Sequence, residues 1–163
     1  GLGMSPSRIT VSTAGIAKMI RKLADDGTKV NLALSLHAAN DDKRNEIMPI
    51  NDQNGIDILM DALEYFYTKT KNRITYEYLA LEGFNDSVED AKQLAALTKR
   101  FPVRVNVIEY NTVAGIDFHK TSEKQLNLFA NTLTRHDVNL TIRKSRGKDI
   151  DAACGQLANA EVV

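Results

Sequence analysis

Hydrophobic and polar residues alternate in five short stretches of this chain. Residues 30–37 show the pattern most clearly, since they read Val-Asn-Leu-Ala-Leu-Ser-Leu-His. Successive side chains of a β-strand point to opposite faces of a sheet, so this alternation predicts a strand with one apolar and one polar face. The same pattern predicts the other strands, and together the five cover residues 8–12, 30–37, 74–81, 103–110 and 138–143.

Helix-like stretches separate the predicted strands. In the first of them, one apolar stripe recurs at helical spacing and ends before Gly27. Ser87 with Asp90, and Ser122 with Gln125, have the three-residue spacing of a capping box at a helix start. The predicted helices cover residues 16–26, 41–70 with a break at Pro49, 87–100 and 122–136.

Strands that alternate with helices predict an α/β fold of parallel strands joined by crossovers. A doubly wound sheet buries both faces, and a closed eight-stranded barrel fills its interior with branched apolar side chains. Every strand here has one polar-leaning face instead. We therefore predict a partial (β/α) barrel of the open kind, with helices outside and a polar concave face. Residues 8–12 would form a raw edge, so we expect the C-terminal part of a longer protein whose first strands are missing here.

Composition is that of an ordinary globular domain, with 163 residues of which 43% are hydrophobic and 26% charged. The formal net charge is zero, which argues against a domain that holds nucleic acid by bulk positive charge. No apolar stretch is long enough to span a membrane, so we expect no membrane partner. One cysteine without a secretory signal favours the reducing cytoplasm. We divide the chain into barrel residues 1–143 and a C-terminal loop or tail, residues 144–163.

Cys154 lies in this tail, and its neighbours are small enough for a bulky partner to approach the sulfur. The basic run at 143–148 lies close by in the sequence, and positive charge favours the nucleophilic thiolate. The alternative is a small buried hydrophobe, as free cysteines commonly are. The basic run is either a solvated loop or a phosphate contact. Its candidate RNA-binding residues are Arg143, Lys144, Arg146 and Lys148.

Polar residues lie where the predicted strands end. In barrels of strands and helices, ligands bind at the C-terminal ends of the strands, where this chain has Ser12, Ser35, His37 and Asn111. Each has a structural alternative: the Ser-Thr pair at 12 and 13 caps the next helix, the histidine makes internal hydrogen bonds, and the asparagine forms a turn. Glu77 lies on the same predicted face and stays unassigned, either a lumen acid or an internal hydrogen-bond acceptor.

Several motifs resemble those of one enzyme family. The longest is Arg-Lys-Ser-Arg-Gly-x-Asp-Ile-Asp-Ala-Ala-Cys-Gly-Gln-Leu at 143–157. Others are Ile-Thr-Val-Ser-Thr at 9–13, Leu-Ser-Leu-His-Ala at 34–38, Met-Pro-Ile-Asn at 48–51, Gly-Phe-Asn-Asp at 83–86 and Val-Asn-Val-Ile at 105–108. With these motifs the chain is similar to the radical SAM RNA methyltransferases that modify C2 of an adenine in 23S rRNA and, in many bacteria, an adenine of tRNA.

This resemblance implies 23S rRNA and tRNA as partners, and we expect a monomer when the protein is full length. It implies S-adenosylmethionine as the methyl donor and Cys154 as the cysteine that becomes methylated. The residues that would contact the methyl donor are Ser12, Ser35, Leu36, His37 and Asn111.

The implied reaction uses S-adenosylmethionine twice. One molecule methylates the thiolate of Cys154 by direct displacement. A second is cleaved reductively at a 4Fe-4S cluster, and the resulting radical takes a hydrogen from that methyl group, whose carbon then adds to C2 of adenine. A second cysteine releases the adduct. The three-cysteine cluster motif, the glycine-rich strand motif and the second cysteine are absent from this sequence, in which we predict no metal ligands. We therefore expect this chain alone to be inactive.

Three other functions remain open at this point. A sister enzyme of the same superfamily methylates C8 of the same adenine and has the same cysteine string, although residues 143–147 look more like the C2 enzymes. The chain could instead be a half-barrel that binds a ligand or RNA without a catalytic thiol. A cytosolic metabolic α/β barrel is disfavoured, because the sequence has no evident metal triad and no phosphate-binding glycine loop.

Overall fold

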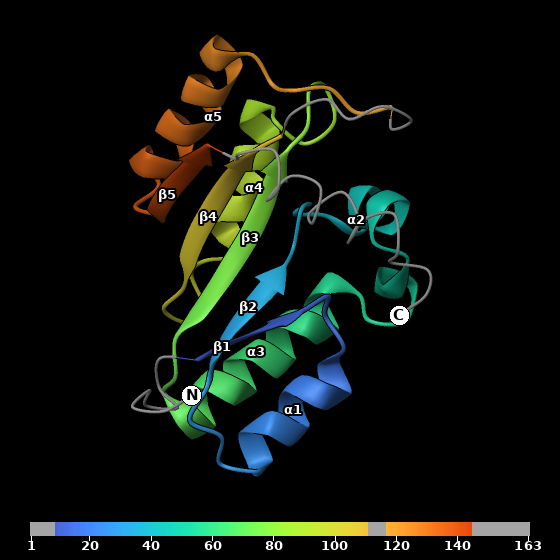
Figure 1. Ribbon diagram of the computed structural model, residues 1–163, viewed down its shortest axis with the longest axis vertical. Helices are drawn as coiled ribbons and strands as arrows, with labels where there is room; N and C mark the ends of the chain where they lie inside the picture. The colour runs from blue at the N-terminus through green and yellow to red at the C-terminus, as the bar shows by residue number, and fades with distance from the viewer. Residues whose placement is uncertain (1–8, 111–116, 145–163) are drawn as a thin grey trace.

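A computed structural model of the protein describes residues 9–110 and 117–144. Its five strands form one parallel sheet in which each strand lies beside the one before it in the sequence (Figure 1). All five predicted strands are confirmed, with bounds that differ by at most two residues at either end. They are β1 (Thr10–Thr13), β2 (Asn31–Ser35), β3 (Ile74–Ala80), β4 (Arg104–Glu109) and β5 (Asn139–Lys144).

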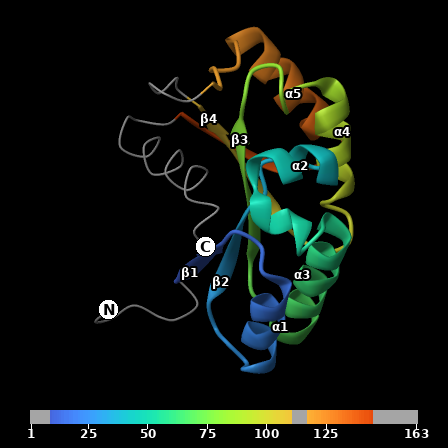
Figure 2. The ribbon, with the colours of Figure 1, turned by 90° about the vertical axis from the view of Figure 1, so that its right-hand side faces the viewer.

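The helices all lie on one side of the sheet, and the other side carries no helix among the described residues (Figure 2). This singly wound order, with helices outside, confirms the predicted partial (β/α) barrel. No helix in the described part of the chain is long and apolar enough to cross a membrane. The helical elements are α1 (Ala17–Asp25), α2 (Asp41–Ile47), the 3₁₀ helix η2 (Pro49–Asp52), α3 (Ile56–Thr70), α4 (Val88–Ala96) and α5 (Glu123–Arg135).

The two predicted capping boxes have different outcomes. At α4 the box is complete, because Ser87 accepts from the Asp90 backbone N–H at 3.0 Å and the Asp90 carboxylate accepts from the Ser87 N–H at 3.1 Å. At α5 the cap is one-sided. Ser122 accepts from the Gln125 N–H at 3.1 Å, but the Gln125 side chain donates to the carbonyl of Asp86 at 2.7 Å instead.

Alternation along the strands sorts the side chains into two layers. On the helix side, Leu34, Tyr76 and Val105 lie side by side in register and are fully buried. These residues belong to the main core between the sheet and helices α1, α3, α4 and α5. On the opposite, open face, one row crosses four strands and is polar throughout: Ser35, Glu77, Asn106 and Thr141.

The first strand departs from the prediction that its apolar side chains pack under the helices. Ile9 is 39% exposed and Val11 is 36% exposed. Val11 does have the expected register, because it pairs with the buried Leu32. Burial fails because β1 is an edge of the described sheet, so no further strand or helix of the described residues covers its outer side. The sequence predicted an uncovered sheet edge here, but not that this edge would leave the side chains of Ile9 and Val11 exposed.

Candidate functional site

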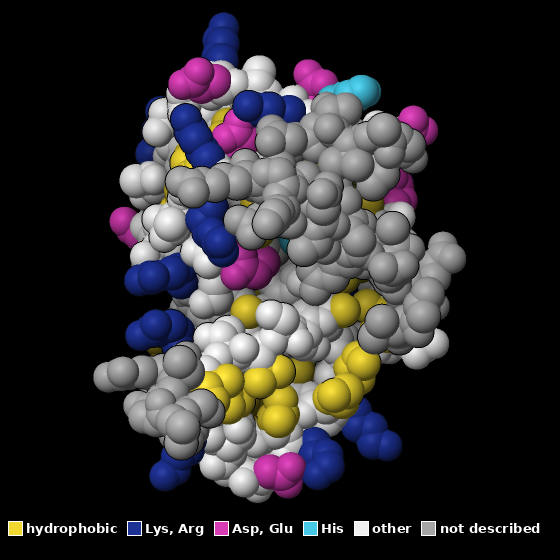
Figure 3. All heavy atoms as spheres, in the orientation of Figure 1, with side chains coloured by type: hydrophobic (Ala, Val, Ile, Leu, Met, Phe, Trp, Pro, Cys, Tyr) yellow, Lys and Arg dark blue, Asp and Glu magenta, His cyan; other side chains and the backbone are white. Residues whose placement is uncertain are grey.

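The candidate site lies on the open face, towards the C-terminal ends of the strands. Figure 3 shows this face, with Lys and Arg side chains along one margin. The order of the parallel strands brings Ser12, on β1, and Ser35, on β2, to the same end of the sheet. Ser12 is exposed beside Ala33, whereas Ser35 is buried beside Glu77. The sequence thus correctly predicted that these two serines share a face.

Neither residue of the Ser-Thr pair at 12 and 13 caps α1, so that structural alternative is wrong. The Thr13 hydroxyl accepts from the Gly15 N–H at 3.0 Å, inside the turn. The first N–H of α1, on Ala17, donates instead to the side chain of Asn54 at 3.0 Å. A residue 37 positions away supplies the cap, and local spacing could not reveal it. Ser12 is therefore free of the capping role.

The middle residue of the run Ser35-Leu36-His37 does not offer its side chain to the open face. The Leu36 side chain is fully buried in the main core. Its backbone N–H donates to the Glu77 carbonyl at 3.0 Å, which continues the pairing of β2 with β3. Any contribution of Leu36 to a ligand site therefore comes through the backbone conformation of this run and not through its side chain.

His37 is buried and held in a left-handed backbone conformation, with φ of 59°. Its ring Nδ1 accepts from the Leu79 N–H at 2.9 Å, and its carbonyl accepts from the Asn85 side chain at 2.8 Å. Burial, reinforced by the Arg44 guanidinium, lowers the pKa of His37 from 6.5 to about 3. The imidazole is therefore neutral at physiological pH, with its proton on Nε2. His37 does make internal hydrogen bonds, yet Nε2–H remains chemically suited to donate to a ligand.

Arg44 on α2 fixes the geometry of the rim, and the sequence analysis missed it. Its side chain is fully buried and donates to the backbone carbonyls of Leu36 at 3.1 Å, Ser35 at 3.0 Å and Ala14 at 2.6 Å. A fourth bond, of 2.9 Å, goes to Asn51, the last residue of the Met-Pro-Ile-Asn motif. Burial lowers the pKa of Arg44 to about 10, which leaves it charged at neutral pH. One guanidinium thus connects the ends of β1 and β2.

Asn85, in the Gly-Phe-Asn-Asp motif, plays the same part for β3. Its amide donates to the carbonyls of Leu79 and His37, each at 2.8 Å, and its oxygen accepts from the Leu81 N–H at 2.8 Å. The Tyr78 hydroxyl in turn donates to the Asn85 carbonyl at 2.6 Å. All these groups are buried, so the amide satisfies backbone atoms that a strand end would otherwise leave unpaired.

Glu77, on the open face, has a carboxylate whose hydrogen bonding is incomplete within the described residues. Its Oε1 accepts from the Asn106 side chain at 3.3 Å, but within the described residues its Oε2 is buried and has no hydrogen-bond partner. A buried carboxylate oxygen without a donor is costly, and such groups are rare in native proteins. From the sequence, Glu77 was left unassigned between a lumen acid and an internal hydrogen-bond acceptor. The unpartnered oxygen favours a ligand that brings its own donor.

An apolar floor borders the polar row at the strand ends. Leu79 and Ile108 lie side by side in register on the open face, and they pack with Phe84 and Phe118. The two phenylalanine rings have centroids 5.5 Å apart. Polar donors and acceptors next to an aromatic and aliphatic floor suit a ligand that has both a charged part and a flat ring.

The remaining candidates fall at the margin of the described residues or outside them. Arg143 and Lys144 end β5 and are exposed; Arg143 pairs with Ile108 on the open face. Asn111, Arg146, Lys148 and the proposed methyl carrier Cys154 lie outside the described residues. Their predicted roles therefore stay predictions.

Comparison with known proteins extends these observations. No protein-family model matches the chain. The probable dual-specificity RNA methyltransferase RlmN of Christiangramia forsetii is 51% identical over 159 residues, which are 98% of this chain and 45% of the relative. The protein of the same name from Cytophaga hutchinsonii is 52% identical over 162 residues, or 99% of this chain and 44% of the relative. The chain thus spans less than half the length of these curated relatives.

Solved structures agree with the fold. A radical SAM methyltransferase from Sphaerobacter thermophilus is 39% identical, with a TM-score of 0.87 over 96% of this chain and 46% of that protein. SuiB of Streptococcus suis, solved with bound S-adenosylmethionine, has a TM-score of 0.59 at 18% identity, which shows the shared fold alone. The partial barrel and its rim thus have the fold of the radical SAM methyltransferase class. Over nearly its whole length, the chain is similar to one part of the dual-specificity RNA methyltransferases.

Proposed function

We propose that this chain forms the methyl-donor half of an RNA methyltransferase that modifies C2 of an adenine in 23S rRNA and in tRNA. The names of the relatives support RNA methylation, and the fold supports the use of S-adenosylmethionine. A cytoplasmic location follows from such substrates. The polar row of the open face, next to the apolar floor, is where the methyl donor would bind.

The observation that carries the proposal is the unpartnered Oε2 of Glu77. S-adenosylmethionine carries an ammonium group and two ribose hydroxyls, any of which can donate to this oxygen, and its adenine suits the apolar floor. The same rim offers Ser35 from the neighbouring strand and the Nε2–H of His37. These residues fit the ligand because they provide both acceptors and donors around a buried position.

Cys154 would accept the methyl group. Its thiolate attacks the methyl carbon of the sulfonium, a carbon–sulfur bond forms as the donor's bond breaks, and S-adenosylhomocysteine leaves. The 4Fe-4S cluster, when bound, would supply the electron for the radical stage. The residues of this chain do not fit such a cluster, because it requires several cysteines and the sequence contains one. We therefore propose that the cluster ligands belong to another part of the full-length parent, and that this chain alone does not turn over.

The test is made in the full-length parent with its cluster reconstituted. Cys154→Ala should abolish RNA methylation and leave the affinity for S-adenosylmethionine within about twofold of wild type, because it removes the carrier and not the rim. Methylated adenosine from the wild-type reaction should be the C2 isomer. Full methylation by the Cys154→Ala enzyme would contradict the carrier role, and a C8 product would contradict the stated position.

A second variant tests the ligand site separately. Glu77→Gln keeps the shape of the side chain but replaces a charged acceptor by a neutral amide. Hydrogen bonds to charged groups are worth about 1.5–3 kcal/mol, so the Kd for S-adenosylmethionine should rise by about tenfold or more in equilibrium titration. The exposed Glu82 provides the matched control, since Glu82→Gln should leave this Kd unchanged. Equal affinities for the two variants would remove Glu77 from the site.

A further inference from the structure

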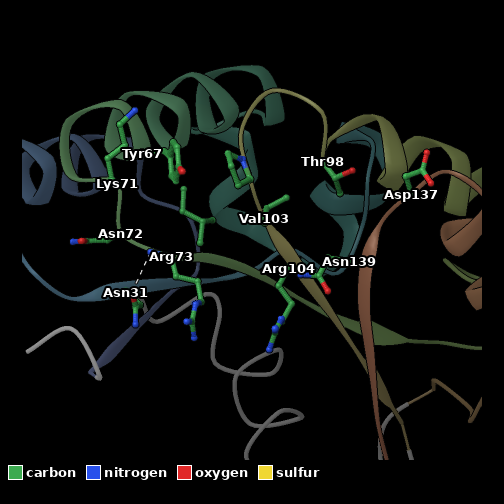
Figure 4. A pocket seen from close by; sticks show the side chains of 12 residues that line it. Asn31, Tyr67, Lys71, Asn72, Arg73, Thr98, Val103, Arg104, Asp137 and Asn139 are labelled. Carbon is green, nitrogen blue, oxygen red and sulfur yellow. Dashed lines mark hydrogen bonds between the residues drawn. The ribbon is translucent and has the colours of Figure 1, made fainter. Parts of the chain in front are cut away.

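A second concave region lies at the other end of the strands, away from the rim. Figure 4 shows this groove, which has a volume of about 820 Å³ and opens between the C-terminal end of α3 and the beginnings of the strands. Its lining is mostly polar and comes from segments far apart in the sequence. We call it the basic groove after its three cationic residues, Lys71, Arg73 and Arg104.

The charge of the basic groove is unbalanced. Asp137 is the one acidic residue among those that line it. Arg73 and Arg104 are exposed, and they form no ion pair within the described residues. The Lys71 ammonium lies 5.1 Å from the centre of the Tyr67 ring, a contact that orients the side chain without neutralising it. Since the whole chain is neutral, this local excess of positive charge is not an average property of the surface.

The two arginines extend in the same direction, from the beginnings of β3 and β4 and away from α3 (Figure 4). Their positions follow from the register: Arg104 pairs with Thr75, and Arg73 precedes Thr75 by two residues, so both side chains belong to the open face. Arg143 lies on that face as well, four residues further along on the neighbouring strand β5, because Arg104 pairs with Asn139. The line of cations therefore leads from the groove towards the rim.

No carboxylate interrupts this line within the described part of β4 and β5. Besides Arg104 and Arg143, the open face of these two strands carries one apolar and three polar neutral side chains: Ile108, Asn106, Asn139 and Thr141. Parallel strands rise about 3.3 Å per residue, so the four-residue step from Arg104 to Arg143 covers about 13 Å. A small anion would occupy one end of such a line, whereas a chain of phosphates would follow all of it.

We propose that the basic groove binds the phosphodiester backbone of the RNA substrate at a distance from the reacting adenine, without reading its sequence. This inference rests on the proposed RNA methyltransferase function. The groove contributes binding free energy by replacing counterions of the phosphates, and it orients the RNA so that the line of arginines leads towards the methyl-donor rim. It adds nothing to the chemical step itself.

The experiment uses the full-length parent and a labelled stem-loop of 23S rRNA, with the Kd measured by fluorescence anisotropy over a salt series. The groove variant is Lys71→Asn/Arg73→Gln/Arg104→Gln; asparagine is chosen because Lys71 has φ of 57° and this residue tolerates that conformation. The matched control removes three exposed lysines on helices of the opposite side, as Lys18→Gln/Lys92→Gln/Lys124→Gln. Both variants lose the same charge.

The groove variant should bind RNA about tenfold or more weakly, and the slope of log affinity against log salt should fall by about 2 to 3, one for each lost phosphate contact. The control should lose far less on both measures. The KM for RNA should rise while kcat at saturating RNA and the Kd for S-adenosylmethionine stay at wild-type values. The charge-conserving variant Arg73→Lys/Arg104→Lys should keep the salt slope, which separates lost charge from misfolding.

Equal losses of RNA affinity in the groove and control variants would overturn the proposal. It would also be overturned if inorganic phosphate displaced the RNA at concentrations whose ionic strength alone does not weaken RNA binding by the control variant. Binding and catalysis are read separately. If the wild-type enzyme bound RNA through the groove but methylated no adenine, the proposed function would fail and the groove would stand. If the wild-type enzyme methylated RNA but the groove variant bound RNA with unchanged affinity, the groove proposal would fail and the proposed function would stand.

Discussion

A single side chain at the rim, His37, has its protonation state set by the fold. Its Nδ1 is occupied by the Leu79 N–H, and burial beside Arg44 lowers its pKa from 6.5 to about 3. In the unfolded chain the same imidazole gains a proton below about pH 6.5. Between these two values the unfolded state therefore binds more protons than the folded state, and falling pH favours unfolding.

We expect His37 to contribute stability that is fully present above pH 6.5 and is lost as the pH falls towards 3. The free energy of unfolding should lose up to about 1.4 kcal/mol per pH unit from this one proton. Asn at this position accepts the φ of 59° and does not titrate, so His37→Asn should flatten the dependence over that range. Urea denaturation at several pH values measures it. The exposed His119 gives the control, and a His37→Asn profile as steep as that of His119→Asn would contradict the assignment.

Arg44 shows why part of the site could not be predicted from the sequence. Charged residues are almost always exposed, so an arginine within Asp-Asp-Lys-Arg-Asn-Glu reads as one more surface charge of an amphipathic helix. Its role appears only when the ends of β1 and β2 and the 3₁₀ helix converge on it. The serines of the rim, by contrast, were predictable, because strand alternation and parallel order place them without reference to distant partners.

At the scale of elements, the two serine caps provide a matched comparison. Ser87 and Ser122 each accept one backbone N–H at a helix start, but only at α4 does the third residue return the bond, and there Asp90 also pairs with Lys43 at 2.6 Å. Ser87→Ala should therefore lower the free energy of unfolding by about 1–2 kcal/mol, and Ser122→Ala by about half as much. Chemical denaturation of the two variants decides this, and a larger loss for Ser122→Ala would show that the reciprocal bond adds nothing.

The elements themselves were largely predictable from the sequence, and the two errors in helix capping share one cause. Period-two and helical patterns located every strand and helix of the described residues, and Pro49 marked the break at which α2 gives way to η2. The errors concern bonds between elements: Asn54 caps α1 in place of a local serine or threonine, and Gln125 binds the carbonyl of Asp86 and not its own helix start. Patterns within a segment predict which way its side chains face, but not which distant atom completes its hydrogen bonds.

At the scale of the whole molecule, the two edges of the described sheet differ in charge. β5 carries Arg143 and Lys144, and charged residues on an edge discourage pairing with another chain. β1 reads Thr-Val-Ser-Thr without a charge, and Ile9 and Val11 leave apolar surface uncovered beside it. Figure 3 shows hydrophobic side chains exposed where β1 lies. This edge is accordingly the part of the described sheet that is best suited to accept a further strand.

We therefore expect the isolated 163-residue chain to self-associate through β1. Val11→Lys places a charge on that edge and should weaken association by about tenfold or more, because pairing would then bring the charges of two chains together. Leu128→Lys is the matched control, since Leu128 is 42% exposed on α5, a helix that packs beside β5 at the opposite end of the sheet from β1. Sedimentation velocity over a concentration series measures the shift. Association that responds equally to both substitutions would mean that general hydrophobic exposure, and not the strand edge, holds the copies together.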